Sequence, residues 1–584
     1  MVLFREGGAL YRVPSGEQTL WGILLCRALA TRLFLWGLGT FLFVTLLTSL
    51  PVWGAESEPP ALQPASSAES PVASDSAPVI KDFHFTGNTT IPVSDLYALL
   101  AAYINQPYNL ETLKKAVDSV SEEYRQRGLD IARAYLPEQD IEDGIIEITI
   151  FEGKLGEIHV TGNKNYSTDF IRRFLSAAIL PDTVESSSDV GTTSAGVPTP
   201  AVTSTALERG LLILNTEFAD LKVMAGLDQG KELGTVDVHA KVEDDSPFHA
   251  TVSVNNFGSP TVSRWRLGVQ MDWTNAILPG SHFNLGILVG EKTDDLANGN
   301  LSYTFPIDTL GTMVSVNGAF GKFDISGDLI ALGIHGKSTS GGISISHPYI
   351  KSRTRNLTGS LGISSSDSKF IILENIANYD RIRTLFVGGQ FDQVHWGGKS
   401  YANVTMTNGI GSFWGGMGEN DPQVSRTGAG GAFTRLNLSY MRFQPMNESW
   451  SIMGRLSGQL ADDSLVAGEE WQVGGPNSVR GFSPGQAAGD EGFNVGLEFL
   501  ASPFANKAIA QFAAFVEQGA AYRKIPVAGQ GKKHDLLGAG VGFRSMFDFY
   551  GDIDFRLDIG FPIDPNQNSL DEEPMLYVSA SMRF

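Results

Sequence analysis

The chain of 584 residues carries a formal net charge of −21, and 42% of its residues are hydrophobic. This length accommodates several domains, and the acidic balance argues against nucleic-acid binding, which requires a basic face. The mean hydropathy of −0.04 is too low for a bundle of membrane helices, yet it is ordinary for a membrane barrel whose strands are half polar.

Residues 1–55 are predicted to be a signal peptide. Two arginines precede an apolar run at 33–50, and the small residues Gly54 and Ala55 follow it at the expected cleavage site. The alternative is a permanent anchor helix, because about 18 apolar residues can just span a bilayer. The single cysteine, Cys26, lies in this leader, so the mature chain is expected to have no internal disulfide and no thiol site.

A flexible linker is predicted at 56–78, where Ser, Ala and Pro dominate and no periodicity is present. The first folded unit then occupies 79–154 and is a small α+β domain of order β-α-α-β-β. Alternation predicts strands at 79–85, 129–136 and 145–151, and helical spacing predicts helices at 91–104 and 110–127.

The second unit, at 155–244, repeats this order. Its Gly162-Asn163 turn repeats the turn at Gly87-Asn88, so the two units are expected to be copies of one fold. A Ser/Thr/Gly/Pro stretch at about 182–205 separates its two helices and is predicted to be a disordered insertion. The predicted elements are strands at 158–160, 221–227 and 236–242 and helices at 168–178 and 207–215.

The remainder, 247–584, contains only strand patterns. Runs of about ten alternating residues are typical of tilted membrane strands. We count about 16 of them, and an even number is what a closed antiparallel barrel with both ends on one side of the membrane requires. They begin near residues 248, 264, 281, 298, 312, 333, 356, 381, 400, 433, 449, 491, 508, 534, 552 and 574.

The last of these strands is apolar on one face up to the C-terminal residue. Leu576, Val578 and Ala580 continue into Met582 and Phe584 at every second position. An apolar edge of this kind invites aggregation in a soluble protein, whereas a barrel in lipid closes it. A strand that ends in Phe also resembles the assembly signal of bacterial outer-membrane barrels, carried here by Tyr577, Met582 and Phe584.

Two motifs in the strand region are weak alone. The first is Val479-Arg480-Gly481-Phe482, in a Gly/Pro-rich stretch that composition alone assigns to a surface loop. The second is Phe515-x-Glu517-x-Gly519, whose lone Glu in a barrel lumen would ordinarily be solvated.

Together they resemble the signature of two-partner secretion transporters, the TpsB family of ShlB/FhaC/HecB-like haemolysin secretion/activation proteins. In that family the first motif lies on a loop folded into the barrel, here about 473–490, and the second receives its arginine. We hypothesise that Arg480 and Glu517 pair, because a guanidinium can hold a carboxylate with two parallel bonds. An Arg480→Glu, Glu517→Arg swap is then expected to restore secretion at least in part.

The resemblance covers nearly the whole mature chain. Matching segments of the first periplasmic POTRA domain lie between Tyr124 and Gly153, those of the second between Leu207 and Thr235, and Asn255-Asn256-Phe257-Gly258 resembles the start of the barrel. The chain departs from the family pattern in carrying Glu517 where Asp is usual. It also has too many prolines at 56–78 for the helical plug that often precedes the first POTRA domain.

The resemblance implies a mainly β fold: a 16-stranded antiparallel transmembrane barrel preceded by two POTRA domains. It implies an outer-membrane translocator with periplasmic POTRA domains that capture an unfolded, β-helical exoprotein of the adhesin or haemolysin kind (TpsA-like). The expected partners are this exoprotein, outer-membrane lipid and lipopolysaccharide, and the barrel assembly machinery during biogenesis. The alternatives are a barrel-assembly factor of the same superfamily and, less favoured, a passive porin.

No enzyme is expected, and neither are catalytic residues, a cofactor or a metal. The chain contains no H-E-x-x-H, G-x-S-x-G or Walker motif. Acidic clusters at Asp462-Asp463, Glu469-Glu470 and Asp571-Glu572-Glu573 are interpreted as solvated turns, and the less favoured alternative is binding of calcium or of a lipopolysaccharide-linked cation.

Overall fold

The computed structural model describes residues 79–584 except 181–200, 564–572 and short gaps at 108, 142, 219, 233, 293–294, 505–508, 527–530 and 549–550. The predicted leader and linker, and most of the predicted insertion, lie outside the described residues. Among the helices described, none combines the length and the apolar character needed to cross a membrane.

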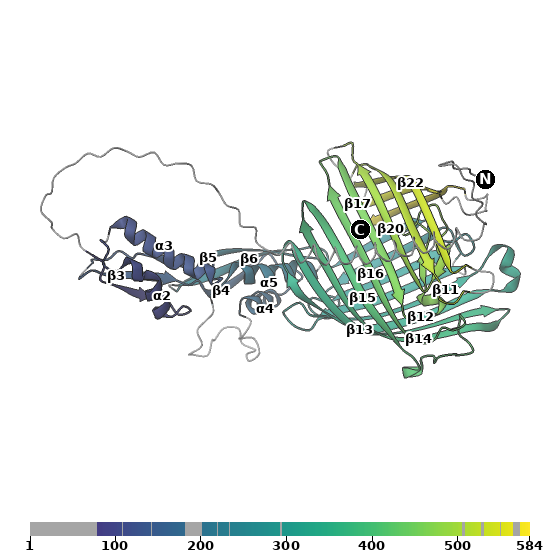
Figure 1. The fold of residues 1–584 in the computed structure, drawn as a ribbon, viewed down its shortest axis with the longest axis horizontal. Helices are drawn as coiled ribbons and strands as arrows, with labels where there is room; N and C mark the ends of the chain where they lie inside the picture. The colour runs from purple at the N-terminus through teal and green to yellow at the C-terminus, as the bar shows by residue number, and fades with distance from the viewer. Residues whose placement is uncertain are drawn as a thin grey trace, which may run out of the picture. The chain divides into compact units, whose positions relative to one another are not determined.

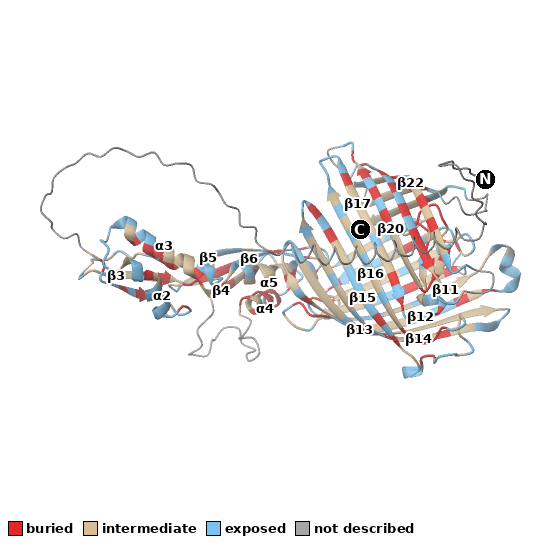
Figure 2. Cartoon of the chain, in the orientation of Figure 1, coloured by how far each residue is buried: buried red, intermediate tan, exposed pale blue. Residues whose placement is uncertain are grey.

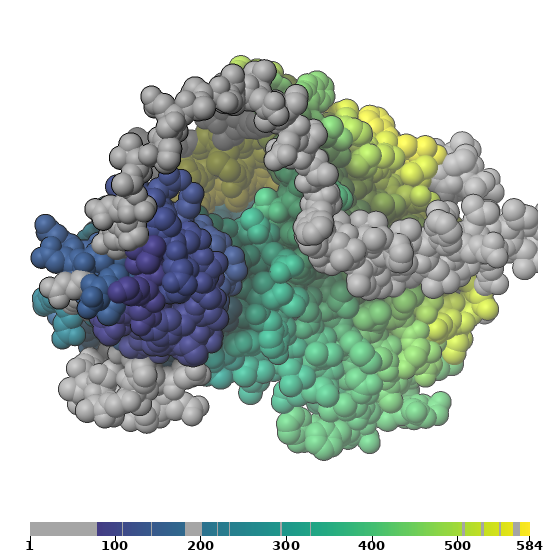
Figure 3. Space-filling view, turned by 60° about the vertical axis from the view of Figure 1, so that its left-hand side comes forward, coloured from purple at the N-terminus to yellow at the C-terminus, as the bar shows by residue number. Residues whose placement is uncertain are grey.

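The first domain packs two helices against a three-stranded sheet of order β1-β3-β2, in which β1 and β3 are parallel. Asn109 caps the longer helix by accepting from the N–H of Thr112 at 2.8 Å. Figure 3 shows the domain, coloured purple to blue, as a compact body. Its core includes the buried Phe83, Leu96 and Val120. Its elements are β1 (Asp82–Thr86), α2 (Val93–Leu100), η1 (Ala101–Tyr103), α3 (Leu110–Gln126), β2 (Arg133–Tyr135) and β3 (Ile145–Phe151).

The strand predicted at 129–136 is three residues long instead. Gly128, with a φ of 85°, ends α3 in the left-handed region. The next residues form a turn, in which the N–H of Ala132 donates to the carbonyl of Leu129 at 3.1 Å. Only the last part of the apolar run therefore reaches the sheet.

The second domain repeats the arrangement with sheet order β4-β6-β5. The predicted insertion is shorter than expected at its C-terminal end, because 201–205 are built into the domain. Ala201 bridges to Lys154, Val202 is fully buried, and Thr203 caps α5. The elements are β4 (Lys154–Thr161), α4 (Thr168–Ile179), α5 (Ser204–Glu217), β5 (Leu221–Gln229) and β6 (Thr235–Asp244).

One carboxylate at the end of the central strand holds the Gly-Asn turn in each domain. Glu152 accepts from the N–H groups of Thr89 and Thr90, both at 2.7 Å, and from the hydroxyl of Tyr124 at 2.9 Å. Asp244 accepts in the same way from the N–H groups of Lys164 and Asn165, at 2.8 and 2.6 Å. The repeat inferred from the turns thus extends to the side chains that fix them.

Residues from Phe248 onward form a closed antiparallel barrel of 16 strands, which confirms the predicted architecture (Figure 1). Each predicted start lies within about six residues of the observed one. The strands are β7 (Phe248–Asn255), β8 (Arg266–Thr274), β9 (His282–Gly290), β10 (Leu296–Pro306), β11 (Met313–Asp324), β12 (His335–Lys351), β13 (Arg355–Ile372), β14 (Asn375–His395), β15 (Gly398–Ile410), β16 (Ala432–Pro445), β17 (Trp450–Ala461), β20 (Glu491–Ala501), β21 (Gln511–Tyr522), β22 (Lys533–Asp548), β23 (Asp552–Pro562) and β24 (Met575–Arg583).

The faces of these strands alternate as a membrane barrel requires. Val404 and Met406 on β15 are 42% and 47% exposed on the outside, where lipid is their solvent, while Asn403 and Thr405 face the lumen. Because β7 follows directly from the second domain, it begins at the end of the barrel nearest that domain in the chain. Counted from β7, the first connection and every second one after it, including 411–431 and 462–490, therefore lie at the other end of the barrel. Figure 2 shows that buried residues gather on the wall near β20 and β22, which marks the interior contact described next.

The barrel closes between β24 and β7 through only five Cα pairs, whereas the other neighbours share at least eight. The side chain of Asn256 extends this short seam. Its amide donates to the carbonyl of Leu576 at 2.8 Å, and its oxygen accepts from the N–H of Val578 at 2.7 Å. The Asn256 side chain therefore adds two hydrogen bonds to the backbone pairing between β24 and β7.

Candidate functional site

The connection at 462–490 folds into the barrel as a hairpin-stemmed loop, which we call the inner loop. Its stem pairs β18 (Trp471–Val473) with β19 (Ala487–Gly489). Val473, Val479 and Phe482 are buried against Ala521 and Leu536 of the wall. Apolar contact thus holds the loop along β21 and β22, and the surface-loop interpretation from composition is wrong for this segment.

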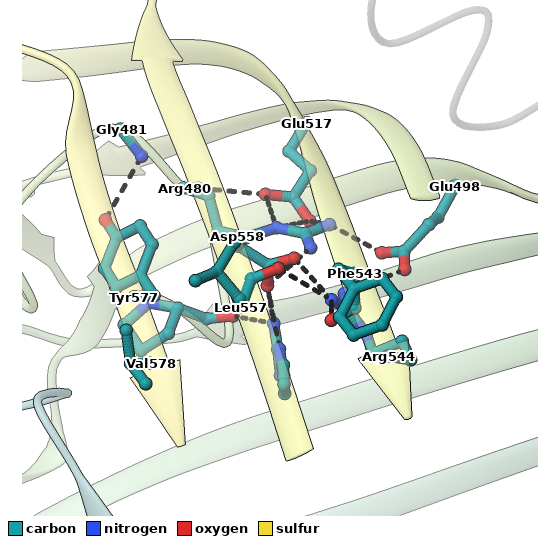
Figure 4. Close-up of polar contacts among 12 residues, drawn as sticks. Arg480, Gly481, Glu498, Glu517, Phe543, Arg544, Leu557, Asp558, Tyr577 and Val578 are labelled. Atoms are coloured by element: carbon teal, nitrogen blue, oxygen red, sulfur yellow. Dashed lines mark hydrogen bonds and ion pairs between the residues drawn. The ribbon is translucent and has the colours of Figure 1, made fainter. Parts of the chain in front are cut away.

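Arg480 lies at the tip of the inner loop and is fully buried. Its Nε donates to both oxygens of Glu517, at 3.1 and 3.0 Å, and its Nη2 donates to Oε1 at 2.6 Å. The remaining N–H groups reach Glu498 at 2.7 Å and Asp558 at 3.1 Å (Figure 4). The guanidinium carbon also lies 3.3 Å from the ring centroid of Phe515, so Phe515 and Glu517 of the wall motif both contact the arginine.

Three further arginines surround the same carboxylates. Arg455 donates to Glu517 at 2.6 Å, Arg544 to Glu498 at 3.1 Å and to Asp558 at 2.6 Å, and Arg556 to Asp558 at 2.7 Å. Each of the three carboxylates therefore has at least one cation besides Arg480. Buried charges are tolerated when they are paired and hydrogen-bonded in this way.

Glycines in the wall make room for the loop backbone. A Cβ at Gly538 of β22 would lie 2.1 Å from the carbonyl oxygen of Arg480, and one at Gly560 of β23 would lie 2.4 Å from the N–H nitrogen of Gly481. A Cβ at Gly519, the third residue of the wall motif, would lie 2.3 Å from Oδ1 of Asn494 and 2.5 and 3.0 Å from the side chains of Val473 and Val479. The glycines of the wall are thus a seat shaped for close backbone approach.

Tyr577 was expected only as part of the C-terminal assembly signal, but it also holds the inner loop. It is buried in the lumen, and its hydroxyl accepts from the N–H of Gly481 at 3.1 Å (Figure 4). The same hydroxyl donates to the carbonyl of Phe482 at 2.8 Å. Met582 and Phe584 lie on the opposite, outward face of β24. Phe584 is 58% exposed there and pairs with Ala250 through the backbone.

A second ionic cluster joins the inner loop to the connection at 411–431. Arg426 donates to Oδ1 of the fully buried Asp490 and to the carbonyl of Leu465, both at 2.5 Å. Its Nη1 also lies 3.2 Å from Glu470, which in turn accepts from Arg523 at 3.3 Å. The expectation that Glu469-Glu470 is solvated is wrong, because the side chain of Glu470 is 7% exposed and paired.

Sequence reasoning found Arg480, Glu517 and Phe515 but missed Glu498, Asp558, Arg455, Arg544 and Arg556. The signal available for the missed residues was a charged side chain at a lumen-facing position of a predicted strand, as in Arg556-x-Asp558. Such a position carries no information about its partner, which lies on another strand.

Comparison with known proteins identifies the family. Residues 234–545 match the model for haemolysin secretion/activation protein ShlB/FhaC/HecB, and residues 79–153 match the ShlB-type POTRA domain. The heme/hemopexin transporter protein HuxB of Haemophilus influenzae is 24% identical over 493 residues, which are 83% of each chain. The outer membrane transporter CdiB of Dickeya dadantii is 24% identical over 71% of this chain and 70% of its own.

The fold is also found in a solved structure. CdiB from Escherichia coli superimposes with a TM-score of 0.67 at 18% identity, covering 92% of this chain and 93% of that one. Transporters of this family are outer-membrane barrels whose N-terminal POTRA domains lie in the periplasm. The connections at 411–431 and 462–490 therefore lie at the cell-surface end of the barrel. With a family model matched over more than half of its length, the chain belongs to the ShlB/FhaC/HecB family of two-partner secretion outer-membrane transporters.

Proposed function

We propose that this chain is the translocator that captures an unfolded exoprotein in the periplasm and passes it through its barrel to the cell surface. The exoprotein is of the β-helical, adhesin- or haemolysin-like kind. The observation that carries the proposal is the inner loop: a porin needs no arginine buried among three carboxylates to hold a loop in its lumen. The outer membrane has no ATP, so folding of the exoprotein outside the cell supplies the direction.

The POTRA domains offer sheet edges for capture. An extended segment that adds a strand to an edge gains backbone hydrogen bonds with little demand on its sequence. The strands predicted at 129–136 and 221–227 are the candidate edges; they correspond to β2 and β5, and each is a terminal strand of its sheet. They differ in how much of the edge is already bonded.

The edge of β2 is short and capped. The outward N–H of Ala134 donates to the hydroxyl of Ser121 at 3.0 Å, and Arg133 donates to the carbonyl of Ala132 at 2.7 Å.

The edge of β5 is capped only near its start, where Asn215 bonds both the N–H and the carbonyl of Val223, at 2.6 and 3.0 Å. Beyond Val223, no side chain among the described residues bonds the outward groups of Ala225 and Leu227. We therefore assign capture to β5. Replacing Ala225 by Pro removes one outward donor and should lower secretion, whereas Ala225→Val keeps the donor and should not.

The competing function, assembly of other barrels, draws support from the short β24–β7 seam, since a weakly paired edge can open to another strand. The two functions differ in what the cell loses. We would delete the gene, compare proteins in the medium by mass spectrometry, and measure outer-membrane barrel levels alongside. Loss of one large secreted protein with barrels unchanged supports translocation, and a general fall in barrels supports assembly.

Contacts with lipid and lipopolysaccharide, and with the assembly machinery during biogenesis, complete the proposal. The outward faces supply the first, as in Val404 and Met406, and the C-terminal strand ending in Phe584 supplies the second.

A further inference from the structure

The lumen contains a cavity of about 480 Å³ beside the tip of the inner loop. Asn477 and Ser478 of the loop line it on one side, and lumen-facing residues of β14 to β17 and β20 line it on the other. Its volume is within the range of about 300–1,000 Å³ that ligand sites occupy.

Part of the wall of this cavity is a row of uncharged polar side chains, and the adjoining row, with Tyr401, Met441 and Arg455, also lines it. Five residues on five adjacent strands stand directly opposite one another: Gln390, Asn403, Ser439, Ser457 and Asn494. The next row continues the pattern, with Asn437 donating to Gln459 at 2.9 Å. The tip of the inner loop reaches one end of the first row, where the hydroxyl of Ser478 donates to Asn494 at 2.9 Å.

The charges around Arg480 lie on another part of the wall. Glu498, Glu517 and Asp558 are on β20, β21 and β23, and Arg455 marks the border between the two regions. The charged network that holds the loop and the uncharged row are therefore two neighbouring parts of the lumen wall, and the row, with Arg455 at its border, lines open space.

Building on the proposed function, we propose that this uncharged row is the site where an extended segment of the exoprotein passes the inner loop. An unfolded chain in a confined space must replace the water bonded to its backbone. Amide side chains both donate and accept, and hydroxyls do the same, so a row of them can bond any backbone. Charged walls would hold back segments of opposite sign, whereas this row does not select by charge.

The test places a photo-crosslinking amino acid at three positions of the full-length transporter during secretion. Asn403 is the test position, Val404 is its lipid-facing neighbour, and Asn300 faces the lumen from β10. The target is the secreted protein that disappears from the medium when the gene is deleted. We expect crosslinks from Asn403, few from Asn300 and none from Val404.

Equal crosslinking from Asn403 and Asn300, or none from Asn403 while secretion proceeds, would overturn the inference and leave the proposed function standing. If deletion removes no secreted protein, the proposed function itself fails before any crosslink is made. A second measurement places a large side chain on the lumen wall. Ser439→Trp should abolish secretion, while the barrel still migrates as a folded, heat-modifiable species. Val404→Trp, on the lipid side of the neighbouring strand, should leave secretion unchanged, and normal secretion by Ser439→Trp contradicts passage along this wall.

Discussion

Arg480 and Glu517 are joined by four hydrogen bonds, one of which comes from the backbone. The N–H of Arg480 donates to Oε2 at 2.9 Å, and the guanidinium supplies the other three. Glu517 thus fixes both the side chain and the local path of the inner loop. The pair is part of a larger set, because Glu498 and Asp558 lie within 3.1 Å of the same guanidinium.

This geometry changes the expected result of the charge swap. In Arg480→Glu, Glu517→Arg the new carboxylate would face Glu498 and Asp558, so like charges would meet in a buried site. We expect no recovery of secretion, although the residues pair directly. Arg480→Lys should also secrete poorly, because an ammonium cannot form the planar fork. Secretion assays with folding checked by heat-modifiable migration measure both, and efficient secretion by the swap would mean that the loop leaves this site.

Asp490 anchors the two cell-surface connections to each other. Besides Arg426, it accepts from the N–H groups of Leu465 and Lys524 at 2.7 and 2.8 Å. Replacing Asp490 by Ala leaves Arg426 with Glu470 as its remaining acidic partner and takes the acceptor from the N–H groups of Leu465 and Lys524. Removing one partner from a buried ion pair costs about 3–5 kcal/mol. We expect 411–431 to become sensitive to protease added to whole cells. Lys533→Ala, which removes an exposed pair with Asp535, is the control and should not change cleavage. Unchanged protection in Asp490→Ala would show that apolar packing alone holds the connection.

The strands were predictable because lipid and lumen impose opposite polarity on alternate residues, a constraint that acts within each run. The partners of Arg480 were harder to predict from the sequence. Glu498, Glu517 and Asp558 lie 18, 37 and 78 residues away from Arg480 in the chain and contact it only when the barrel closes. Glu517 was predicted because Phe515-x-Glu517-x-Gly519 resembles a family motif, and no such motif pointed to Glu498 or Asp558. The strand at 129–136 failed for a local reason, because the turn after Gly128 uses half of the apolar run.

The side chain of Asn256 should contribute measurably to closure of the barrel. In Asn256→Ala the carbonyl of Leu576 and the N–H of Val578 lose their partners, and each buried unsatisfied group costs about 1–3 kcal/mol. We expect the variant to lose its folded migration at a lower temperature than the parent protein in detergent. Val254→Ile, an outward-facing change on β7, should not shift that temperature. An unchanged Asn256→Ala would indicate that the five backbone pairs suffice.

Glu152 should make the turn at Thr89-Thr90 sensitive to acid. Burial raises the pKa of Glu152, but the hydrogen bonds from Thr89, Thr90 and Tyr124 outweigh it and hold the pKa below the usual 4.5. A lowered folded-state pKa stabilises the domain above the unfolded value, and the stabilisation is lost as the pH falls through the folded one. Hydrogen exchange of this turn, corrected for the intrinsic rate, should rise below about pH 4.5 in the parent and be less pH-dependent in Glu152→Gln. The turn held by Asp244 should keep its own acid response in that variant, and an identical response at Thr89-Thr90 would contradict the assignment.

The glycine seat allows the position of the inner loop to be tested without changing any charge. In Gly538→Ala the added methyl group would overlap the carbonyl oxygen of Arg480, which lies 2.1 Å from the ideal Cβ position, so either the loop or the wall must move. Because β22 is bonded on both sides, we expect the loop to move, with loss of secretion and greater protease sensitivity at 473–490. Gly454→Ala, where no atom lies within 4 Å, is the matched control on β17 and should behave as the parent. If Gly538→Ala secretes normally, the seat is not needed for the active position of the loop. If it fails while all four arginines and three carboxylates remain, backbone fit matters alongside the ionic network.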